Sequence, residues 1–229
     1  LDVAQPRFGT MLDTPKPGWS GADVAGVLTA GLGCPWAIDT DVNGAALAEY
    51  RWGAGQGCDS LCCITIGTGV GGGLVIGGRP VHGAMHPEIG HLRLRRAGGD
   101  DFVGNCPFHG DCIEGLISGP ALAGRFGGDP ALVSGDDARW SYVASDLAEL
   151  VGAILFTTSA QRVLIGGGIG MARAGLTEAA RDLVVVRAGE YLPFLDRDSA
   201  DILIGLPELG DMAGPLGAIA LAIAAAESV

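Results

Sequence analysis

Three side chains that could bind a metal ion occur at regular spacing in one short segment of the sequence. Cys106, His109 and Cys112 follow one another at intervals of three residues in the stretch Cys-Pro-Phe-His-Gly-Asp-Cys. Pro107 and Gly110 disfavour a regular helix, so this segment is expected to form a compact loop. Thiolate and imidazole ligands in such a loop are typical of a tetrahedral Zn²⁺ site, although a Cys/His loop can also arise by coincidence.

A tetrahedral site needs a fourth ligand, and the first candidate is His91, just upstream of the loop. The alternatives are His82 and His86, with the carboxylates Asp111 and Glu114 as weaker competitors in a thiolate-rich site. Four protein ligands would make the metal structural rather than an activator of water. A metal held by His91 would also fix the position of Glu88, a carboxylate with little structural reason to be there.

A second polar cluster reads Asp-Thr-Asp-Val-Asn at residues 39–43, between an expected strand and an expected helix. Ligands in open α/β sheets bind at the carboxyl ends of strands, so Asp41 could act as a general base toward a substrate hydroxyl. Asp and Asn are also favoured as N-caps of helices, which is a purely structural explanation. Both interpretations hold if Asp39 or Thr40 caps the helix and Asp41 points into a cleft.

Two glycine-rich segments could bind phosphate or a nucleotide. Residues 65–73 read Thr-Ile-Gly-Thr-Gly-Val-Gly-Gly-Gly, where backbone N–H groups could converge on an anion and Thr68 would add a hydroxyl donor. This segment lacks a Walker-type lysine and lies between two expected strands, so an ordinary glycine hairpin is an equal alternative. A run of three glycines at 166–168 follows an expected strand, a place suited to a nucleotide but also common in structural turns.

Alternating strands and helices must position these residues. Strands are expected at short apolar runs, namely 36–38, 60–66, 74–76, 162–165 and 201–204. Helices are expected at 23–32, 41–49, 113–126 with an interruption at 119–120, 136–156, 176–191 and 213–226. Strands alternate with helices in the second half of the chain, which predicts the α/β fold class.

The composition indicates a globular protein of one large domain or two small ones. The chain has 229 residues, of which 48% are apolar and 17% charged, so it can bury a substantial core and is unlike a disordered chain. Its net charge of −12 and the lack of a basic stripe argue against a nucleic-acid partner.

The cysteines and apolar runs indicate a cytoplasmic protein without membrane spans. The six cysteines do not suggest a secreted disulfide framework. Four of them are expected in the core: Cys34, Cys58, Cys62 and Cys63. No signal peptide is evident, and the apolar run at 217–224 is too short to cross a membrane.

Together these segments resemble the ROK family of sugar kinases and sugar-responsive repressors, and in particular its bacterial fructokinase branch. The resemblance keeps its order over nearly the whole chain and is carried by residues 39–47, 67–73, 83–91, 106–115, 164–168 and 210–214. The segment Thr-Pro-Lys-Pro-Gly-Trp at 14–19 is also similar to that branch, and Cys-Pro-Phe-His-Gly-Asp-Cys resembles its zinc loop.

The resemblance implies an actin-like ATPase (ribonuclease H-like) fold of two domains with ATP in the cleft between them. The family's first phosphate loop, of the form Asp-x-Gly-Gly-Thr, has no match here, so the small domain is expected to be truncated by several dozen residues and its phosphate and Mg²⁺ sites to be incomplete. We expect a remnant of the small domain at 1–40, a large domain with the zinc loop at 41–212, and a C-terminal helix at 213–229 that packs back toward the small domain.

The resemblance also implies roles for individual residues. Asp41 matches the catalytic base. The sugar-contacting positions are Thr40, Asp41, Glu88, His91 and Glu114. The second phosphate loop comprises Thr68, Gly69, Gly71 and Gly72, and the adenosine-side loop comprises Gly166, Gly167 and Gly168. The zinc ligands are His91, Cys106, His109 and Cys112.

The implied activity is ATP-dependent phosphorylation of a hexose, with D-fructose converted to fructose 6-phosphate as the favoured reaction. The implied cofactors are ATP, Mg²⁺ and a structural Zn²⁺, and the implied assembly is a homodimer without nucleic-acid or membrane partners. Two alternatives stay open: a sugar-sensing transcriptional regulator of the same family, and an inactive fragment stabilised by zinc.

Overall fold

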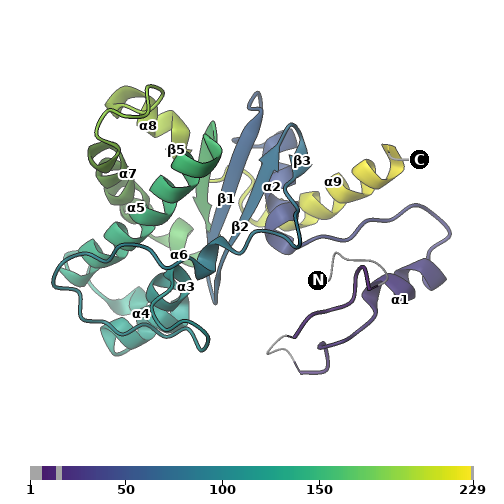
Figure 1. Cartoon of the computed structure of the whole chain (residues 1–229), viewed down its shortest axis with the longest axis horizontal. Coiled ribbons are helices and arrows are strands. Elements are labelled where there is room, and N and C mark those ends of the chain that lie inside the picture. Colours follow the sequence, from purple (N-terminus) through teal and green to yellow (C-terminus); the bar gives the residue numbers. More distant parts are fainter. Residues whose placement is uncertain (1–6, 14–16, 228–229) are drawn as a thin grey trace.

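The computed structural model describes residues 7–13 and 17–227, and within them a five-stranded sheet lies between two layers of helices (Figure 1). The strand order is β3-β2-β1-β4-β5. β1 (Ser60–Ile66) pairs antiparallel with β2 (Val70–Ile76) and parallel with β4 (Arg162–Gly166). The sheet continues with β3 (Arg79–Pro80) beside β2 and β5 (Ile204–Gly205) beside β4.

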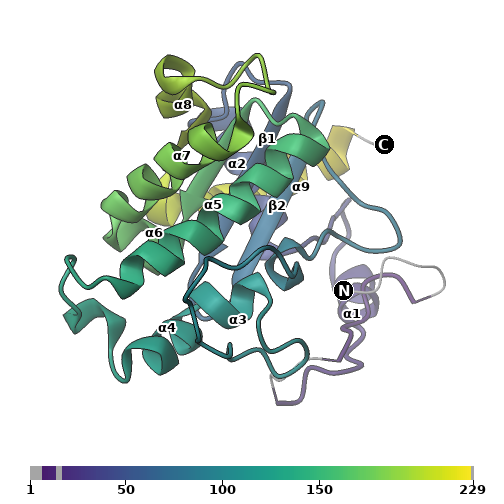
Figure 2. The same cartoon turned by 60° about the vertical axis from the view of Figure 1, so that its left-hand side comes forward.

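The central strand β1 is buried on both faces, which explains its nearly continuous apolar sequence. Cys62, Ile64 and Ile66 face one core, while Leu61 and Cys63 face the other. The first core is completed by α3 (Ile113–Ile117), α5 (Arg139–Thr158) and α7 (Ala174–Ala188). The second is completed by α2 (Asp41–Trp52) and α9 (Ala213–Glu227), on the opposite side of the sheet (Figures 1 and 2).

Helices α2 and α9 cross at two glycines. A methyl group on Gly217 would lie 2.5 Å from the carbonyl carbon of Gly44, so the two backbones meet without an intervening side chain. This contact holds α9 against α2 on the side of the sheet where the chain enters from α1 (Val24–Gly31). The remaining described helices are α4 (Gly119–Phe126), α6 (Gly167–Ala172), α8 (Arg197–Leu203), and the short 3₁₀ turns η1 (Ile89–His91), η2 (Pro130–Leu132) and η3 (Gly210–Met212).

The expected strands at 36–38 and 201–204 are wrong. Residues 35–40 form no strand and lead directly into α2. Residues 197–203 form helix α8, because Asp196 accepts hydrogen bonds from the N–H groups of Asp198 and Ser199 and starts a helix there. Only Ile204 of the second run enters the sheet.

The glycine hairpin is shorter than the sequence suggests. β2 begins at Val70, so the turn comprises residues 67–69 and the glycines at 71–73 lie within the strand. The expected strand at 60–66 and the helices starting at Asp41, Ile113 and Ala213 are confirmed.

The cysteines separate into two groups. Cys58, Cys62 and Cys63 are buried as expected, whereas the expectation is wrong for Cys34, which is exposed in a segment that follows the end of α1 at the surface. In the described part of the chain, no helix combines the length and apolar character needed to cross a membrane. The expected loop at 14–19 lies partly outside the described residues, and the proposed domain boundaries at 40 and 212 stay predictions.

Candidate functional site

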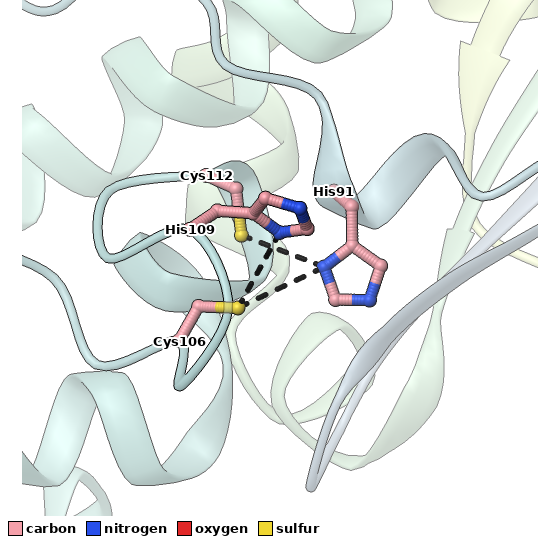
Figure 3. A group of neighbouring side chains, drawn as sticks. All are labelled: His91, Cys106, His109 and Cys112. Carbon is pink, nitrogen blue, oxygen red and sulfur yellow. Dashed lines mark hydrogen bonds between the residues drawn. The ribbon is translucent and has the colours of Figure 1, made fainter. Parts of the chain in front are cut away.

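Four potential metal ligands converge from two segments of the chain (Figure 3). His91, at the end of η1, places its Nδ1 3.8 Å from Sγ of Cys106 and 3.6 Å from Sγ of Cys112. His109 places its Nδ1 3.7 Å from Sγ of Cys106. All four ligand atoms lie within 4.8 Å of one another.

The spacing of these atoms fits a tetrahedral ion. With bonds of about 2.3 Å to sulfur and about 2.1 Å to nitrogen, tetrahedral geometry puts each S···N pair roughly 3.6 Å apart. The three measured S···N distances are 3.6 to 3.8 Å. Two thiols and two imidazoles form a donor set suited to Zn²⁺, and the four residues use all four tetrahedral positions.

The backbone of the loop shapes this cluster. Cys106 and Gly110 exchange two hydrogen bonds, with N···O distances of 3.1 and 2.9 Å, which closes the loop into a tight hairpin. Gly110 has φ +65°, a conformation that favours glycine. Both cysteines are buried, and burial raises the pKa of the Cys112 thiol. Thiolates at this position therefore require a compensating cation.

The other candidate ligands have different partners. His82 Nε2 lies 3.1 Å from the carboxylate of Asp39, and His86 Nε2 lies 2.9 Å from Oε1 of Glu88. The carboxylate alternatives are also engaged: Asp111 accepts a hydrogen bond from Arg93 at 2.9 Å, and Glu114 accepts one from Val70 N at 3.0 Å. The geometry therefore selects His91 from the alternatives that the sequence left open.

In the cluster at 39–43, one residue caps α2 and another is exposed at the surface. Thr40 caps α2, since its Oγ1 accepts a hydrogen bond from Asn43 N at 3.2 Å. Asp41, the first residue of the helix, is exposed and accepts a hydrogen bond from Val42 N at 2.9 Å. Asp41 is thus available at the N-terminus of α2, where the helix dipole favours a negative charge.

Asp39 is a nearly buried carboxylate that the sequence did not single out as a site residue. Its Oδ1 accepts hydrogen bonds from Thr40 N at 2.8 Å and Asn43 Nδ2 at 2.7 Å, and its carboxylate also meets His82. Only 7% of its side chain is exposed. The contact with His82 spans 43 residues of sequence, so no local signal could reveal it. This network ties the start of α2 to the chain that follows β3.

The first turn of α2 packs on the glycines of β2. A methyl group on Gly71 would lie 2.9 Å from Cγ1 of Val42, and one on Gly73 would collide with the carbonyl oxygen of Val42. Ile89 fills the corresponding space beside Gly72. The absence of side chains at these strand glycines therefore lets the first turn of α2 and Ile89 pack directly on β2.

A cavity of about 390 Å³ opens beside the three glycines at the junction of β4 and α6. Gly166, Gly167 and Gly168 line it together with Thr65 of β1, Ala45 and Glu49 of α2, and Asp211 of η3. Since β1 and β4 are parallel, with Thr65 opposite Gly166, both strands end at this edge of the sheet. This is the edge where open α/β sheets bind ligands.

The cavity depends on one glycine and on one carboxylate that the sequence did not reveal. Gly167 has φ +79°, and a methyl group there would lie 2.5 Å from the N and O atoms of Ile66. Glu49 is buried and accepts hydrogen bonds from the backbone of Ala54, Glu208 and Leu209 at 2.9, 3.2 and 2.8 Å. It thereby holds the segment before η3 against α2 and shapes one wall.

The proposed phosphate-loop residues lie at the same sheet edge but not in this cavity lining. Thr68 and Gly69 form the β1–β2 turn, where Thr68 is exposed. A larger cavity of about 730 Å³ lies elsewhere, between α5, α7 and residues 94–98, and contains none of the residues singled out above.

Comparisons with known proteins identify the family of this chain. Residues 3–225 match the ROK family. The fructokinase of Zymomonas mobilis is 42% identical over 230 residues, covering 98% of this chain and 74% of the relative.

Two solved structures share the fold. A ROK hexokinase from Thermus thermophilus superposes with a TM-score of 0.75 at 27% identity, covering 93% of this chain and 73% of the other. A ROK family glucokinase from Streptomyces griseus, in complex with glucose and AMPPNP, has a TM-score of 0.63 at 24% identity, covering 97% and 78% of the two chains. The expected α/β, actin-like ATPase fold is thereby confirmed, and the chain belongs to the ROK family.

Proposed function

We propose that this protein is a sugar kinase that transfers the γ-phosphoryl group of ATP to D-fructose, forming fructose 6-phosphate. The assignment of fructose is supported by the 42% identity to a fructokinase over nearly the whole chain. ATP as donor is supported by the AMPPNP bound to a structural neighbour. One observation on this chain carries the proposal: α2 presents an exposed Asp41 at its N-terminus while its next turns line the cavity at Gly166–Gly168.

In this proposal Asp41 is the general base. It accepts the proton of the attacking sugar hydroxyl as that oxygen forms a bond to the γ-phosphorus and the bond to the β-phosphate oxygen breaks. Phosphoryl transfer needs positioning and charge neutralisation more than covalent chemistry, so Asp41 as base depends on the groups that hold the sugar and the phosphates around it. Thr40 caps the helix that carries this carboxylate and thereby orients it.

The sugar would lie between Asp41 and the loop at residues 106–112, called the metal loop below. It would contact Thr40, Glu88, His91 and Glu114. Structural Zn²⁺ would be held by His91, Cys106, His109 and Cys112, whose geometry fits it. The ion would supply rigidity by fixing the orientation of the His91 ring, an arrangement in which a metal organises a substrate pocket from outside it.

The nucleotide would occupy the cavity at the three glycines where β4 ends and α6 begins. Gly166, Gly167 and Gly168 allow its adenosine side to approach the backbone closely. The phosphates would extend toward Thr68 and Gly69, with Mg²⁺ neutralising part of their charge. Gly71 and Gly72 support this loop from within β2 rather than from the turn.

The test is a coupled turnover assay with ATP, Mg²⁺ and a panel of hexoses, together with calorimetric sugar binding. We expect fructose to be the preferred substrate, and Asp41→Asn to lower kcat by about 10²- to 10⁴-fold while sugar affinity is kept. Asp59→Asn is the matched control, because Asp59 is exposed at the opposite end of β1.

Each other outcome removes part of the proposal. Unchanged turnover in Asp41→Asn would exclude Asp41 as the base. Sugar binding without phosphorylation of any hexose would favour the sugar-sensing regulator, and the absence of sugar binding would favour an inactive zinc-stabilised chain.

A further inference from the structure

We propose that Glu114 is a positioning residue for the β1–β2 turn at residues 67–69, the proposed phosphate loop. Through Glu114, the position of this turn would depend on the structure of the metal loop. The inference rests on the proposed function only in taking this turn as the site of the nucleotide phosphates. It gives Glu114 a role in nucleotide binding that is separate from any contact with the sugar.

The carboxylate of Glu114 reaches directly into the turn. Its Oε2 accepts a hydrogen bond from Val70 N at 3.0 Å. Glu114 lies in the first turn of α3, and Val70 is the first residue of β2, so this bond connects the two elements. A methyl group on Gly69 would lie 2.7 Å from the same oxygen, so the absence of a side chain at Gly69 makes this approach possible. The carboxylate therefore fixes the end of the turn nearer β2.

The other end of the turn is held from the same region of the chain. Gly119 N, at the junction of α3 and α4, donates a hydrogen bond to the carbonyl oxygen of Gly67 at 2.7 Å. Within the turn, Gly67 N donates to the carbonyl oxygen of Gly69 at 2.9 Å. The five-residue helix α3 thus spans the turn, with Glu114 at one end and Gly119 just beyond the other.

The metal cluster joins the two segments that press on Val70. Glu114 lies two residues after the ligand Cys112. On the other side, Gly90, next to the ligand His91, packs so closely on the carbonyl of Val70 that a side chain would collide with it. Ile113 N also donates a hydrogen bond to the carbonyl oxygen of Leu92 at 3.0 Å, which connects the two segments. A metal ion bound between them would hold both against the turn.

Loss of the Glu114 carboxylate should therefore loosen the turn even without any sugar present. The Val70 N–H would lose its acceptor, and hydrogen bonds to charged groups are strong enough that local opening should become about tenfold more frequent. Glutamine at this position keeps an oxygen acceptor of the same reach, so Glu114→Gln should preserve the position of the turn while removing the charge.

The test compares wild type, Glu114→Ala, Glu114→Gln and Glu88→Ala by amide hydrogen exchange and by AMPPNP binding. We expect Glu114→Ala to speed exchange of a peptide spanning residues 67–71 by about tenfold and to weaken AMPPNP binding by a similar factor, with Glu114→Gln close to wild type in both. Glu88→Ala is the matched control, since Glu88 is also a proposed sugar contact but its carboxylate pairs with His86 and not with the turn. Chelation of the metal from wild type should speed exchange of the same peptide.

Unchanged exchange of residues 67–71 in Glu114→Ala would overturn the proposal, as would an equal increase in Glu88→Ala. If the exchange rate of this peptide stays unchanged after verified removal of the metal, the proposed coupling between the turn and the metal loop is overturned. The exchange measurement requires neither sugar nor turnover. A failure to phosphorylate any hexose would therefore contradict the proposed function alone, and the exchange rates would still decide whether Glu114 positions the turn.

Discussion

Arg125 and Asp146 form an ion pair inside the hydrophobic core, with Nη2 of Arg125 3.0 Å from Oδ2 of Asp146 and side chains only 2% and 1% exposed. The pair joins α4 to α5, and Arg125 also donates a hydrogen bond to Asp100 at 3.0 Å. Burial raises the pKa of Asp146 to about 6, although the positive charges of Arg125 and Arg96 act in the opposite direction. Ionised Asp146 is therefore a cost to the folded state.

This pair predicts a pH dependence of stability. A carboxyl whose pKa is higher in the folded state holds its proton longer there, so its contribution to stability falls as pH rises from the unfolded value near 4 to the folded value of about 6. We expect wild type to lose up to about 1.4 kcal/mol per pH unit relative to Asp146→Asn across this window, with no further change above it. Urea unfolding of both proteins at pH 4 to 8 measures the difference.

Asp182→Asn is the control for this series, because Asp182 is an exposed acid on α7. Its unfolding free energy should stay parallel to that of wild type. A difference between wild type and Asp146→Asn that does not vary with pH would exclude the raised pKa.

The metal cluster predicts one tightly bound zinc ion per chain. Cys112→Ser should lose the ion. At a free zinc concentration one hundred times the wild-type dissociation constant, the ion stabilises the wild-type fold by about 3 kcal/mol, and the variant should lack this stabilisation. His82→Gln and His86→Gln should retain the ion, since these histidines pair with Asp39 and Glu88. Elemental analysis and thermal unfolding check both statements. Wild-type protein that contains no zinc after purification with zinc supplied would contradict the ligand set.

Thiol reactivity should follow burial and metal binding. Cys34 is exposed and should react with iodoacetamide in the native protein, whereas burial raises the pKa of Cys62 to about 12 and leaves its thiol protonated and inaccessible. Cys106 and Cys112 are also buried, so after chelation they should react only to the extent that the loop that carries them opens. Mass spectrometry of tryptic peptides measures each site, with Cys34→Ser as the control for the first reaction. Rapid native labelling of Cys62 would show that the β1 core opens readily.

Gly167→Ala should destabilise the protein, because the residue has φ +79° and the added methyl group would meet Ile66 at 2.5 Å. We expect a loss of about 2 kcal/mol or more in the free energy of unfolding. Gly168→Ala is the matched control: apart from its chain neighbours and the backbone of its own helix, no atom lies within 4 Å of a methyl group there, and its loss should stay below about 1 kcal/mol. Equal losses in the two variants would remove the argument that the start of α6 packs closely on Ile66 of β1.

The sequence alone predicted the elements whose signals are local. The apolar run at 60–66 is short and β-branched, and the helix at Asp41 begins with a capping residue, so both could be identified without tertiary information. The apolar residues at 201–204 suit a helix as well as a strand, and the capping box at Asp196 decides for the helix. The expected strand at 36–38 failed because an extended run becomes a strand only with a hydrogen-bonding partner, which sequence patterns do not provide.

The same division holds at the site. Cys106, His109 and Cys112 could be recognised from the sequence because their spacing of three within one loop is itself a local property. The fourth position was open among three histidines and, less favourably, two carboxylates, and only the tertiary structure decided it. Asp39 and Glu88 engage His82 and His86, while His91 meets the thiols. The contact of Glu114 with Val70 spans 44 residues, and that of Glu49 with Leu209 spans 160. Such contacts arise when folded elements pack together, and a one-dimensional pattern does not record which distant backbone groups will face a given carboxylate.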